Sequence, residues 1–441
     1  MDYFNMLYIK IKVGERLFSL KNENKLTKII LFLSCIILFY LILISIFYYG
    51  NSTLLGDFYE PNNDDVKFIR SAWNLVQTGV YTYHKPPAPT VFMMPGLSYT
   101  LAFWMKIFGE FGGITAFRIM QGVAQVLSLL LLFYISRKAF NSKVAIAAVL
   151  LDLIYIPEIW VPNLILTESF FKFFVLGLVY FSIWAIDKNE TKFYILGGIA
   201  LGFATLFRPT ISTYPIVILI IWIIKKISFK NAIKYVVVVA AVFSLILSPW
   251  WIRNYKTFNR FIPFTLATGN PMLQGTFINY DQTTKAIDGL DYTHYNTKDP
   301  KLSEIQRNTM EISLSKYRLD TLFPKEPLKF IYWYTIGKGA IQVRTPFYWK
   351  SIFNVKYAME DKYHVLLLVL SLFGAILYFI RRNKDVSGIL IIGTIIYFII
   401  VYLPFFTMSR YFYPVMSLVI MLSSYFCISV LETVRYFRLK R

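Results

Sequence analysis

Long apolar runs constrain this chain more than any other feature. The first run, residues 29–49, contains no charged side chain. A helix of about 20 apolar residues crosses the hydrocarbon core of a bilayer. Similar runs recur to the end of the chain, and short basic segments separate several of them. The sequence therefore predicts an all-α polytopic integral membrane protein with about ten spanning helices.

Composition and charge exclude two other classes of protein. Hydrophobic residues make up 56% of the chain and charged residues only 16%, which is wrong for a soluble domain. The net charge of +21 would suggest a nucleic-acid partner in a soluble protein. Here the cations lie between apolar runs, where membrane proteins carry them, so nucleic acid is excluded. Cys35 and Cys427 lie inside apolar runs and predict neither a disulfide framework nor a metal site.

The segment at residues 91–108 decides the predicted topology. If it spans the membrane, the basic connector at 137–143 and all later basic connectors lie outside. If it lies along the membrane surface, these connectors and both termini lie inside, as the positive-inside rule requires. We therefore expect a juxtamembrane helix at 91–108, with residues 50–113 and 253–363 on the non-cytoplasmic side.

This topology divides the chain into three parts. Residues 1–252 are expected to form an N-terminal transmembrane module whose first external loop, 50–113, is catalytic. Residues 253–363 are expected to form a second external loop with an interfacial helix at 327–349, where Trp and Tyr are frequent. Residues 364–441 are expected to form the C-terminal transmembrane helices.

Four basic residues on the predicted external face are exceptions to the positive-inside rule. Arg208, Arg253 and Arg410 lie at the ends of predicted spans, and Lys85 lies in a Pro-rich stretch. A single arginine at such a position is often an anchor that extends to the membrane surface. Four cations on one face favour a shared anionic ligand, because guanidinium groups match phosphate oxygens and lysine supplies a point charge.

Acidic residues are predicted on the same face. Glu168 starts a predicted span, where a carboxylate is costly unless it is paired or functional. Asp64 and Asp65 begin a helical pattern, so one can cap the helix while the other serves as a general base. His84 could ligate a metal with nearby carboxylates, but a lone histidine is more often a polar contact.

These residues belong to an ordered set of short motifs along the chain. The first outer loop contributes Asp64, Phe68, Ala72, Leu75, Gly79, His84-Lys85-Pro86-Pro87, Pro95-Gly96 and Phe108-Gly109. Later parts contribute Thr167-Glu168, Gly202, Leu206-Phe207-Arg208-Pro209, Pro249-Trp250, Arg253-Asn254, Gly269-Asn270, Arg410-Tyr411 and Pro414. The set resembles the GT-C glycosyltransferases that use polyprenyl-phosphate sugars, near the family 39-like enzymes, the aminoarabinose transferases and the relatives of protein mannosyltransferases. Phe68 departs from the pattern, since the family usually has tyrosine there.

The resemblance implies a GT-C-like helix bundle with an inverting transferase activity. The enzyme would move a hexose or pentose from a polyprenyl-phosphate carrier to an envelope lipid, glycan or protein. It would act at the periplasmic or external face of the cytoplasmic (inner) membrane. No cofactor is firmly implied, and a divalent metal is left open.

The resemblance also implies roles for individual residues. Asp64 would deprotonate the acceptor hydroxyl, with Asp65 as the alternative one residue away. Glu168 would act near the acceptor or a metal, and His84 would contact metal or substrate. The donor phosphate would be held by Lys85, Arg208, Arg253 and Arg410.

Two other functions compete with this interpretation. A lipid or polysaccharide flippase or transporter usually has two related halves and ionisable groups near the bilayer midplane. The sequence shows no repeat, and Asp152 is its one mid-span carboxylate. An O-antigen ligase-like enzyme would have a dominant external loop flanked by arginines, and would not need an acid just after the first span.

Overall fold

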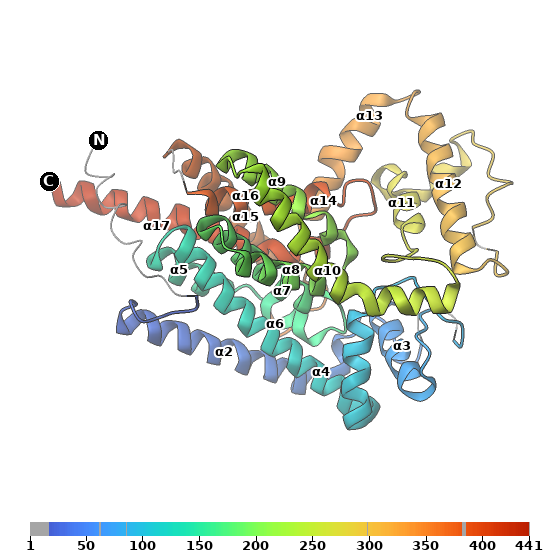
Figure 1. Ribbon diagram of the computed structural model, residues 1–441, viewed down its shortest axis with the longest axis horizontal. Helices are drawn as coiled ribbons and strands as arrows, with labels where there is room; N and C mark the ends of the chain where they lie inside the picture. Colours follow the sequence, from blue (N-terminus) through green and yellow to red (C-terminus); the bar gives the residue numbers. More distant parts are fainter. Residues whose placement is uncertain (1–16, 61–62, 85, 298, 382–384, 441) are drawn as a thin grey trace.

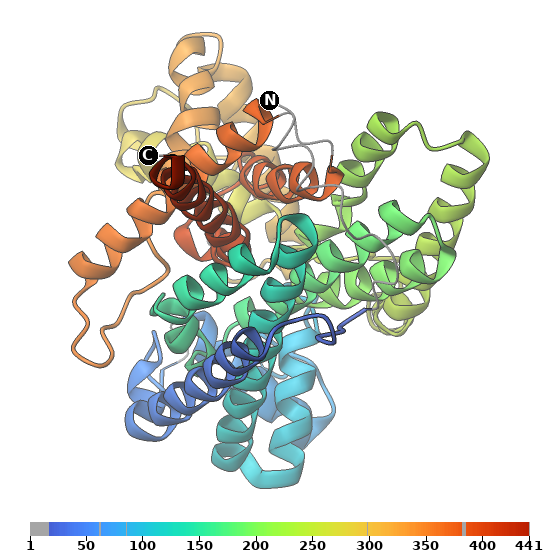
Figure 2. The same ribbon diagram turned by 90° about the vertical axis from the view of Figure 1, so that its left-hand side faces the viewer.

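The structure of the protein is a computed structural model that describes residues 17–60, 63–84, 86–297, 299–381 and 385–440. All regular elements in these ranges are helices. The longer helices run together in a bundle, and a smaller group of helices projects from one end of it (Figures 1 and 2). The prediction of an all-α polytopic membrane protein is confirmed.

Within the described residues, six stretches are long and apolar enough to cross a membrane. Their main helices are α2 (Lys25–Tyr49), α4 (Gly96–Ala139), α7 (Glu168–Lys188), α10 (Phe229–Phe258), α15 (Tyr357–Ile380) and α17 (Met416–Lys440). A bent pair could supply a seventh span: α5 (Ser142–Leu153) meets the stretch from α6 (Pro157–Trp160) to Asn163 at 67°. Pro157 begins the second half, which agrees with the interruption that proline causes.

Three shorter apolar helices lie in further apolar runs of the sequence, which count among the ten predicted spans. They are α8 (Thr191–Phe207), α9 (Pro215–Lys225) and α16 (Val386–Ile400). A straight helix of 17 residues, such as α8, covers only about 26 Å at 1.5 Å per residue, slightly less than the hydrocarbon core. The count of ten spans therefore stays a prediction.

Local sequence explains α3 (Asp64–Thr78), which follows the first span. Asn63 is its N-cap, and the Asn63 side chain accepts a hydrogen bond from the backbone N–H of Asp64. Gly79 ends the helix at φ +73°, a conformation that glycine adopts without strain. Val66 and Ile69 are fully buried, and each contributes roughly 1.5–3 kcal/mol by leaving water. The packing of α3 against α4 holds the start of α3 in place.

Helix α4 bends sharply at Gly109, where φ is +74° and ψ is 179°. The segment before the bend folds back on the segment after it. The two segments touch where the Trp104 indole nitrogen lies 3.0 Å from the Met120 sulfur. A side chain at Gly113 would come within 2.4 Å of the Met105 Cα atom. The structure thus gives residues 96–108 a helical segment of their own, as predicted, although residues 91–95 are not helical. Its position at the membrane surface stays a prediction.

The projecting group of helices lies in the predicted second external loop (Figure 1). It contains α11 (Gly269–Gly275), α12 (Glu304–Leu322), α13 (Pro327–Tyr332), a π-helical turn (Trp333–Gly337) and α14 (Lys338–Val343). Helix α12 starts with a capping box, in which Ser303 and Gln306 bond to each other's backbone N–H groups. The predicted interfacial segment 327–349 is helical only as far as Val343.

A buried ion pair lies in the core of the bundle. The Lys172 ammonium contacts the Glu158 carboxylate, and neither side chain is exposed. Gln125 donates a second hydrogen bond to Glu158. Asp152, the mid-span carboxylate noted in the sequence, is also buried and accepts a hydrogen bond from Ser417 at 3.1 Å. Because an unpaired charge in this apolar core would be costly, the pair constrains how α6 and α7 pack.

Replacing Lys172 with methionine should strongly destabilise the protein. The change leaves the Glu158 carboxylate buried without its cation, which costs about 3–5 kcal/mol of unfolding free energy. Unfolding in mixed detergent micelles would measure the loss. The double variant Glu158→Gln/Lys172→Met should regain most of the stability.

A matched control is Lys143→Met. Lys143 pairs with Glu432 at 2.7 Å, but the two side chains are 68% and 45% exposed. Such a pair contributes about 0–1 kcal/mol. Equal losses for Lys143→Met and Lys172→Met would contradict this account of the core.

Candidate active site

An apolar cavity of about 240 Å³ opens where α3, α7, α8 and the turns before α17 converge. Its polar lining consists of Asp64, Thr167, Arg208, Thr210, Thr265, Thr268, Tyr402, Arg410 and Tyr411. The main apolar lining consists of Phe68, Phe92, Met93, Met94, Leu166, Phe207, Pro271, Phe405 and Phe406. The cavity therefore combines charged groups with an extended apolar wall.

Asp64 is the carboxylate that lines this cavity. Its Oδ2 atom accepts a hydrogen bond from Arg410 Nη2 at 2.9 Å, and its Oδ1 atom accepts one from the Tyr83 hydroxyl at 2.9 Å. Burial raises the pKa of Asp64, but Arg410, Tyr83 and Lys67 together outweigh burial and lower this pKa below its ordinary value. The Asp64 carboxylate is therefore ionised at neutral pH and oriented by two fixed donors.

Asp65 has a different environment, although it is one residue away. Its side chain is fully buried and accepts hydrogen bonds from the backbone N–H groups of Leu55, at 2.5 Å, and Val66, at 2.9 Å. These bonds tie the segment after α2 to the start of α3. The interpretation that one of the two aspartates caps the helix is wrong, because Asn63 is the N-cap. Of the two aspartates, Asp64 lines the cavity, whereas Asp65 is bonded to backbone N–H groups away from it.

Glu168 and two arginines complete a cluster of charges beside Asp64. Glu168 begins α7 and is fully buried. Arg208 Nη2 donates to Glu168 Oε1, and Arg208 Nε donates to the Thr167 hydroxyl at 2.8 Å. Arg410 Nε lies 3.9 Å from the same Glu168 oxygen. Arg410 thus lies between the two carboxylates, and Asp64, Arg410, Glu168 and Arg208 form an alternating charge cluster.

Two tyrosines orient the arginines of the charge cluster. The Tyr411 ring lies 4.8 Å from the Arg208 guanidinium carbon and 5.3 Å from that of Arg410. Tyr402 stacks on Tyr411, with ring centroids 4.8 Å apart. Aromatic faces attract guanidinium groups and hold them in a plane. Tyr402 and Tyr83 were not predicted from the sequence, where the signal for Tyr83 is its place directly before the motif at His84.

Arg253 does not line the cavity. Its Nη1 atom donates to the Thr90 carbonyl at 2.7 Å, and its Nη2 atom lies 3.4 Å from the Tyr81 carbonyl. These contacts make Arg253 an anchor for the loop between α3 and α4. The sequence could not separate it from Arg208, because both follow a predicted span.

Of the other two predicted site residues, Lys85 lies outside the described residues. The exposed His84 ring packs against Tyr83 and Phe92, with centroid distances of 4.9 and 4.3 Å. His84 does not line the cavity.

The described residues do not form a set of metal ligands. No group of three or more His, Cys, Asp or Glu side chains among them could hold an ion. Asp64 and Glu168 both face guanidinium groups, which would repel a cation. The carboxylates as arranged therefore fit a divalent metal poorly.

Comparisons with known proteins give one family match and several structural matches. The family described as dolichyl-phosphate-mannose-protein mannosyltransferase matches residues 85–252. No curated protein matches the sequence. The matched segment contains Glu168 and Arg208, but not Asp64 or Arg410.

Solved structures of membrane transferases match nearly the whole chain. AglB, the oligosaccharyltransferase of Archaeoglobus fulgidus in complex with an inhibitory peptide and a dolichol-phosphate, is 15% identical, with a TM-score of 0.53. The match covers 94% of this chain and 51% of AglB. The apo form of the Archaeoglobus fulgidus oligosaccharyltransferase is also 15% identical, with a TM-score of 0.56 and coverages of 95% and 52%. This chain therefore spans about half the length of the oligosaccharyltransferase.

A third structure is ArnT from Cupriavidus metallidurans bound to undecaprenyl phosphate. It is 13% identical, with a TM-score of 0.42 and coverages of 91% of this chain and 77% of ArnT. At these identities a structural match establishes the fold alone, and the two oligosaccharyltransferase structures carry that assignment. The chain has the GT-C membrane fold, which confirms the resemblance found in the sequence.

Proposed function

We propose that this protein is a membrane glycosyltransferase that moves a sugar from a polyprenyl phosphate to an acceptor hydroxyl. The observation that carries the proposal is the charge cluster of Asp64, Arg410, Glu168 and Arg208 beside an apolar-walled cavity. Two comparisons support a lipid-linked donor. The matching family is described as dolichyl-phosphate-mannose-protein mannosyltransferase, and the AglB structure contains a dolichol-phosphate. The predicted topology supports a site on the non-cytoplasmic face of the cytoplasmic membrane.

The arginines would bind the phosphate of the donor. A guanidinium has five N–H donors, and Arg410 Nε has no hydrogen-bond partner among the described residues. As the glycosidic bond breaks, negative charge develops on the polyprenyl phosphate. Fixed cations in a water-poor cavity stabilise that charge, and losing one such contact commonly costs roughly a hundredfold in rate.

Asp64 would serve as the general base. The acceptor oxygen attacks the anomeric carbon from the face opposite the phosphate, and its proton passes to Asp64. The bond between the anomeric carbon and the phosphate oxygen breaks, and its electron pair leaves with the phosphate, so the configuration is inverted. General-base assistance of this kind contributes roughly 10²–10⁴-fold.

The apolar wall would accommodate the first isoprene units of the carrier. Phe92, Met93 and Phe207 line the cavity together with Phe405 and Phe406. Methionine and aromatic side chains adapt to irregular hydrocarbon surfaces at little cost. Charged and apolar parts of the cavity would therefore bind the two parts of one amphiphilic donor. The sugar would be a hexose or pentose, and the acceptor an envelope lipid, glycan or protein.

Replacing Asp64 with asparagine tests the base. The folded fraction of Asp64→Asn should bind donor but transfer sugar about a hundredfold more slowly, because the amide oxygen still accepts a hydrogen bond from Arg410 but takes up no proton. Since the pKa of Asp64 is already lowered, the wild-type rate should not fall through protonation of Asp64 between pH 7 and about pH 5. The rate of donor consumption in nanodiscs measures both effects.

The matched control for the base is Asp65→Asn. It should lower the folded fraction by weakening the bond to the Leu55 N–H, with activity falling in proportion. A well-folded but inactive Asp65→Asn beside an active Asp64→Asn would overturn the assignment. A transporter or a ligase-like enzyme would retain full activity with Asp64→Asn.

Substitutions of the arginines test the phosphate site. Arg208→Gln should weaken binding of undecaprenyl phosphate at least about tenfold per folded molecule, because it removes a charge-assisted contact. Arg208→Lys should restore binding only in part, since an ammonium keeps the charge and loses the planar fork. Binding to protein in nanodiscs measures the series.

Arg253→Gln is the control for the phosphate site, because Arg253 contacts backbone carbonyls outside the cavity. Its affinity for undecaprenyl phosphate should stay close to that of the wild type. An equal loss of affinity in Arg253→Gln and Arg208→Gln would show that the cavity does not define the phosphate site.

A further inference from the structure

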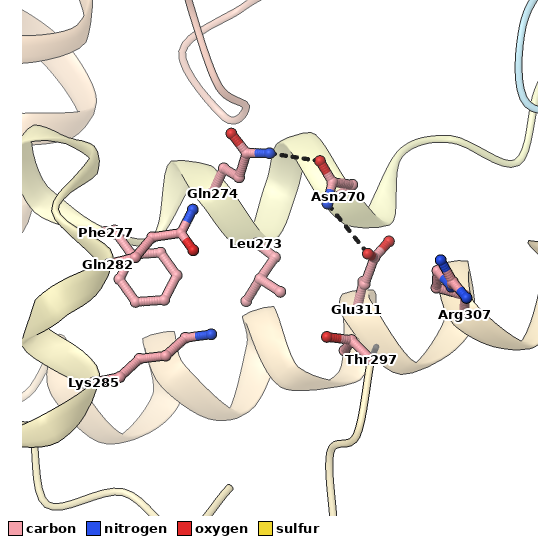
Figure 3. A pocket seen from close by; sticks show the side chains of 9 residues that line it. All are labelled: Asn270, Leu273, Gln274, Phe277, Gln282, Lys285, Thr297, Arg307 and Glu311. Carbon is pink, nitrogen blue, oxygen red and sulfur yellow. Dashed lines mark hydrogen bonds between the residues drawn. The ribbon is translucent and has the colours of Figure 1, made fainter. Parts of the chain in front are cut away.

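A second cavity lies between α11 and α12 in the projecting group of helices, outside the spans identified above. Its volume is about 380 Å³, within the range of roughly 300–1,000 Å³ found for small-molecule sites. Figure 3 shows the nine side chains that line it, which are Asn270, Leu273, Gln274, Phe277, Gln282, Lys285, Thr297, Arg307 and Glu311.

Three side-chain amides contribute to the polar lining of this cavity, beside a threonine and three charged groups. Gln274 donates to the Asn270 side-chain oxygen at 2.6 Å, and Asn270 donates to Glu311 Oε1 at 3.2 Å. Figure 3 shows this chain of bonds along one wall, with Gln282 on the same lining. Each amide offers two donors and an acceptor, which suits a ligand rich in hydroxyl groups.

A buried donor in the cavity lacks a partner. Arg307 Nη2 donates to the Asp299 carbonyl at 3.1 Å, but Arg307 Nε is buried with no hydrogen-bond partner among the described residues. Buried polar groups are nearly always satisfied by protein, ordered water or ligand, and none of the described residues satisfies this nitrogen. Figure 3 shows Lys285 and Arg307 at opposite ends of the lining, with Glu311 beside Arg307.

Helix α11 separates this cavity from the charge cluster's cavity. Asn270, Leu273 and Gln274 recur at the spacing of one helix face and line the second cavity. Pro271 lies on another face and lines the first. The helix is pinned to α12, because the Gly269 N–H donates to Asn308 and a Cβ atom at Gly269 would lie 2.5 Å from the Asn308 carbonyl oxygen. The two cavities therefore share one firmly held wall.

We propose that the second cavity binds a sugar residue of the acceptor, so that the acceptor is a glycan. The inference rests on the proposed transferase function and names the acceptor class of the same enzyme. A glycan chain could place one residue among the amides while a neighbouring residue approaches Asp64 around α11. An apolar lipid acceptor would leave the amide and charged groups of this lining without partners.

Binding of simple glycosides to the full-length protein in nanodiscs tests the proposal. The probes are the methyl glycosides of glucose, N-acetylglucosamine and glucuronic acid, followed by saturation-transfer NMR. At least one should bind the wild type. Gln274→Leu and Gln282→Leu should each weaken that binding about fivefold, the effect of losing one hydrogen bond. Gln282 lies in an exposed turn, so its variant should fold even if Gln274→Leu does not.

The control variant is Gln77→Leu, an exposed glutamine on α3 that lines neither cavity. It should bind the glycoside as the wild type does, and all variants should bind undecaprenyl phosphate equally. If no glycoside binds, or if all the glutamine variants bind it alike, the acceptor site is refuted while the transferase function stands. If undecaprenyl phosphate does not bind the wild type, the transferase function fails, and the acceptor role fails with it.

Discussion

The charge cluster of Asp64, Arg410, Glu168 and Arg208 is the interaction on which the rest of the structure depends. It joins residues up to 346 positions apart in the sequence. In a water-poor environment each of these charges would be costly alone, so every cation needs a carboxylate from another helix end. The requirement brings the start of α3, the start of α7, the end of α8 and the turn before α17 to one place. The same convergence leaves the cavity that the donor would enter.

The sequence identified four members of this site on different grounds. Arg208 and Arg410 are cations on the predicted external face, and Glu168 is a carboxylate at the start of a predicted span. Asp64 and Asp65 begin a helical pattern, and the family resemblance pointed to Asp64. Arg253 is also a cation on the predicted external face. Its partners are backbone carbonyls, and a sequence pattern does not identify such partners. Tyrosines that orient the charges were hidden among many other aromatic residues, and the long-range contacts that select them are set by tertiary packing.

The fold was predictable to the extent that apolar runs determine it. Runs without charges form the spanning helices, and the basic connectors separate them as expected. The fold-back at Gly109 was only partly predictable, because glycine permits a bend without specifying its direction. Helix α12 and the cavity behind α11 escaped prediction, since a mostly polar helix has no strong apolar period and a cavity is formed by contacts between distant segments.

The most direct test of the central claim is a structure of the protein in nanodiscs with a bound polyprenyl-phosphate sugar. The account predicts the phosphate within hydrogen-bond distance of both Arg208 and Arg410, with the isoprenoid chain along the apolar wall. Asp64 would then face the anomeric carbon from the side opposite the phosphate. A phosphate bound instead at Arg253, with the four paired charges undisturbed, would contradict it.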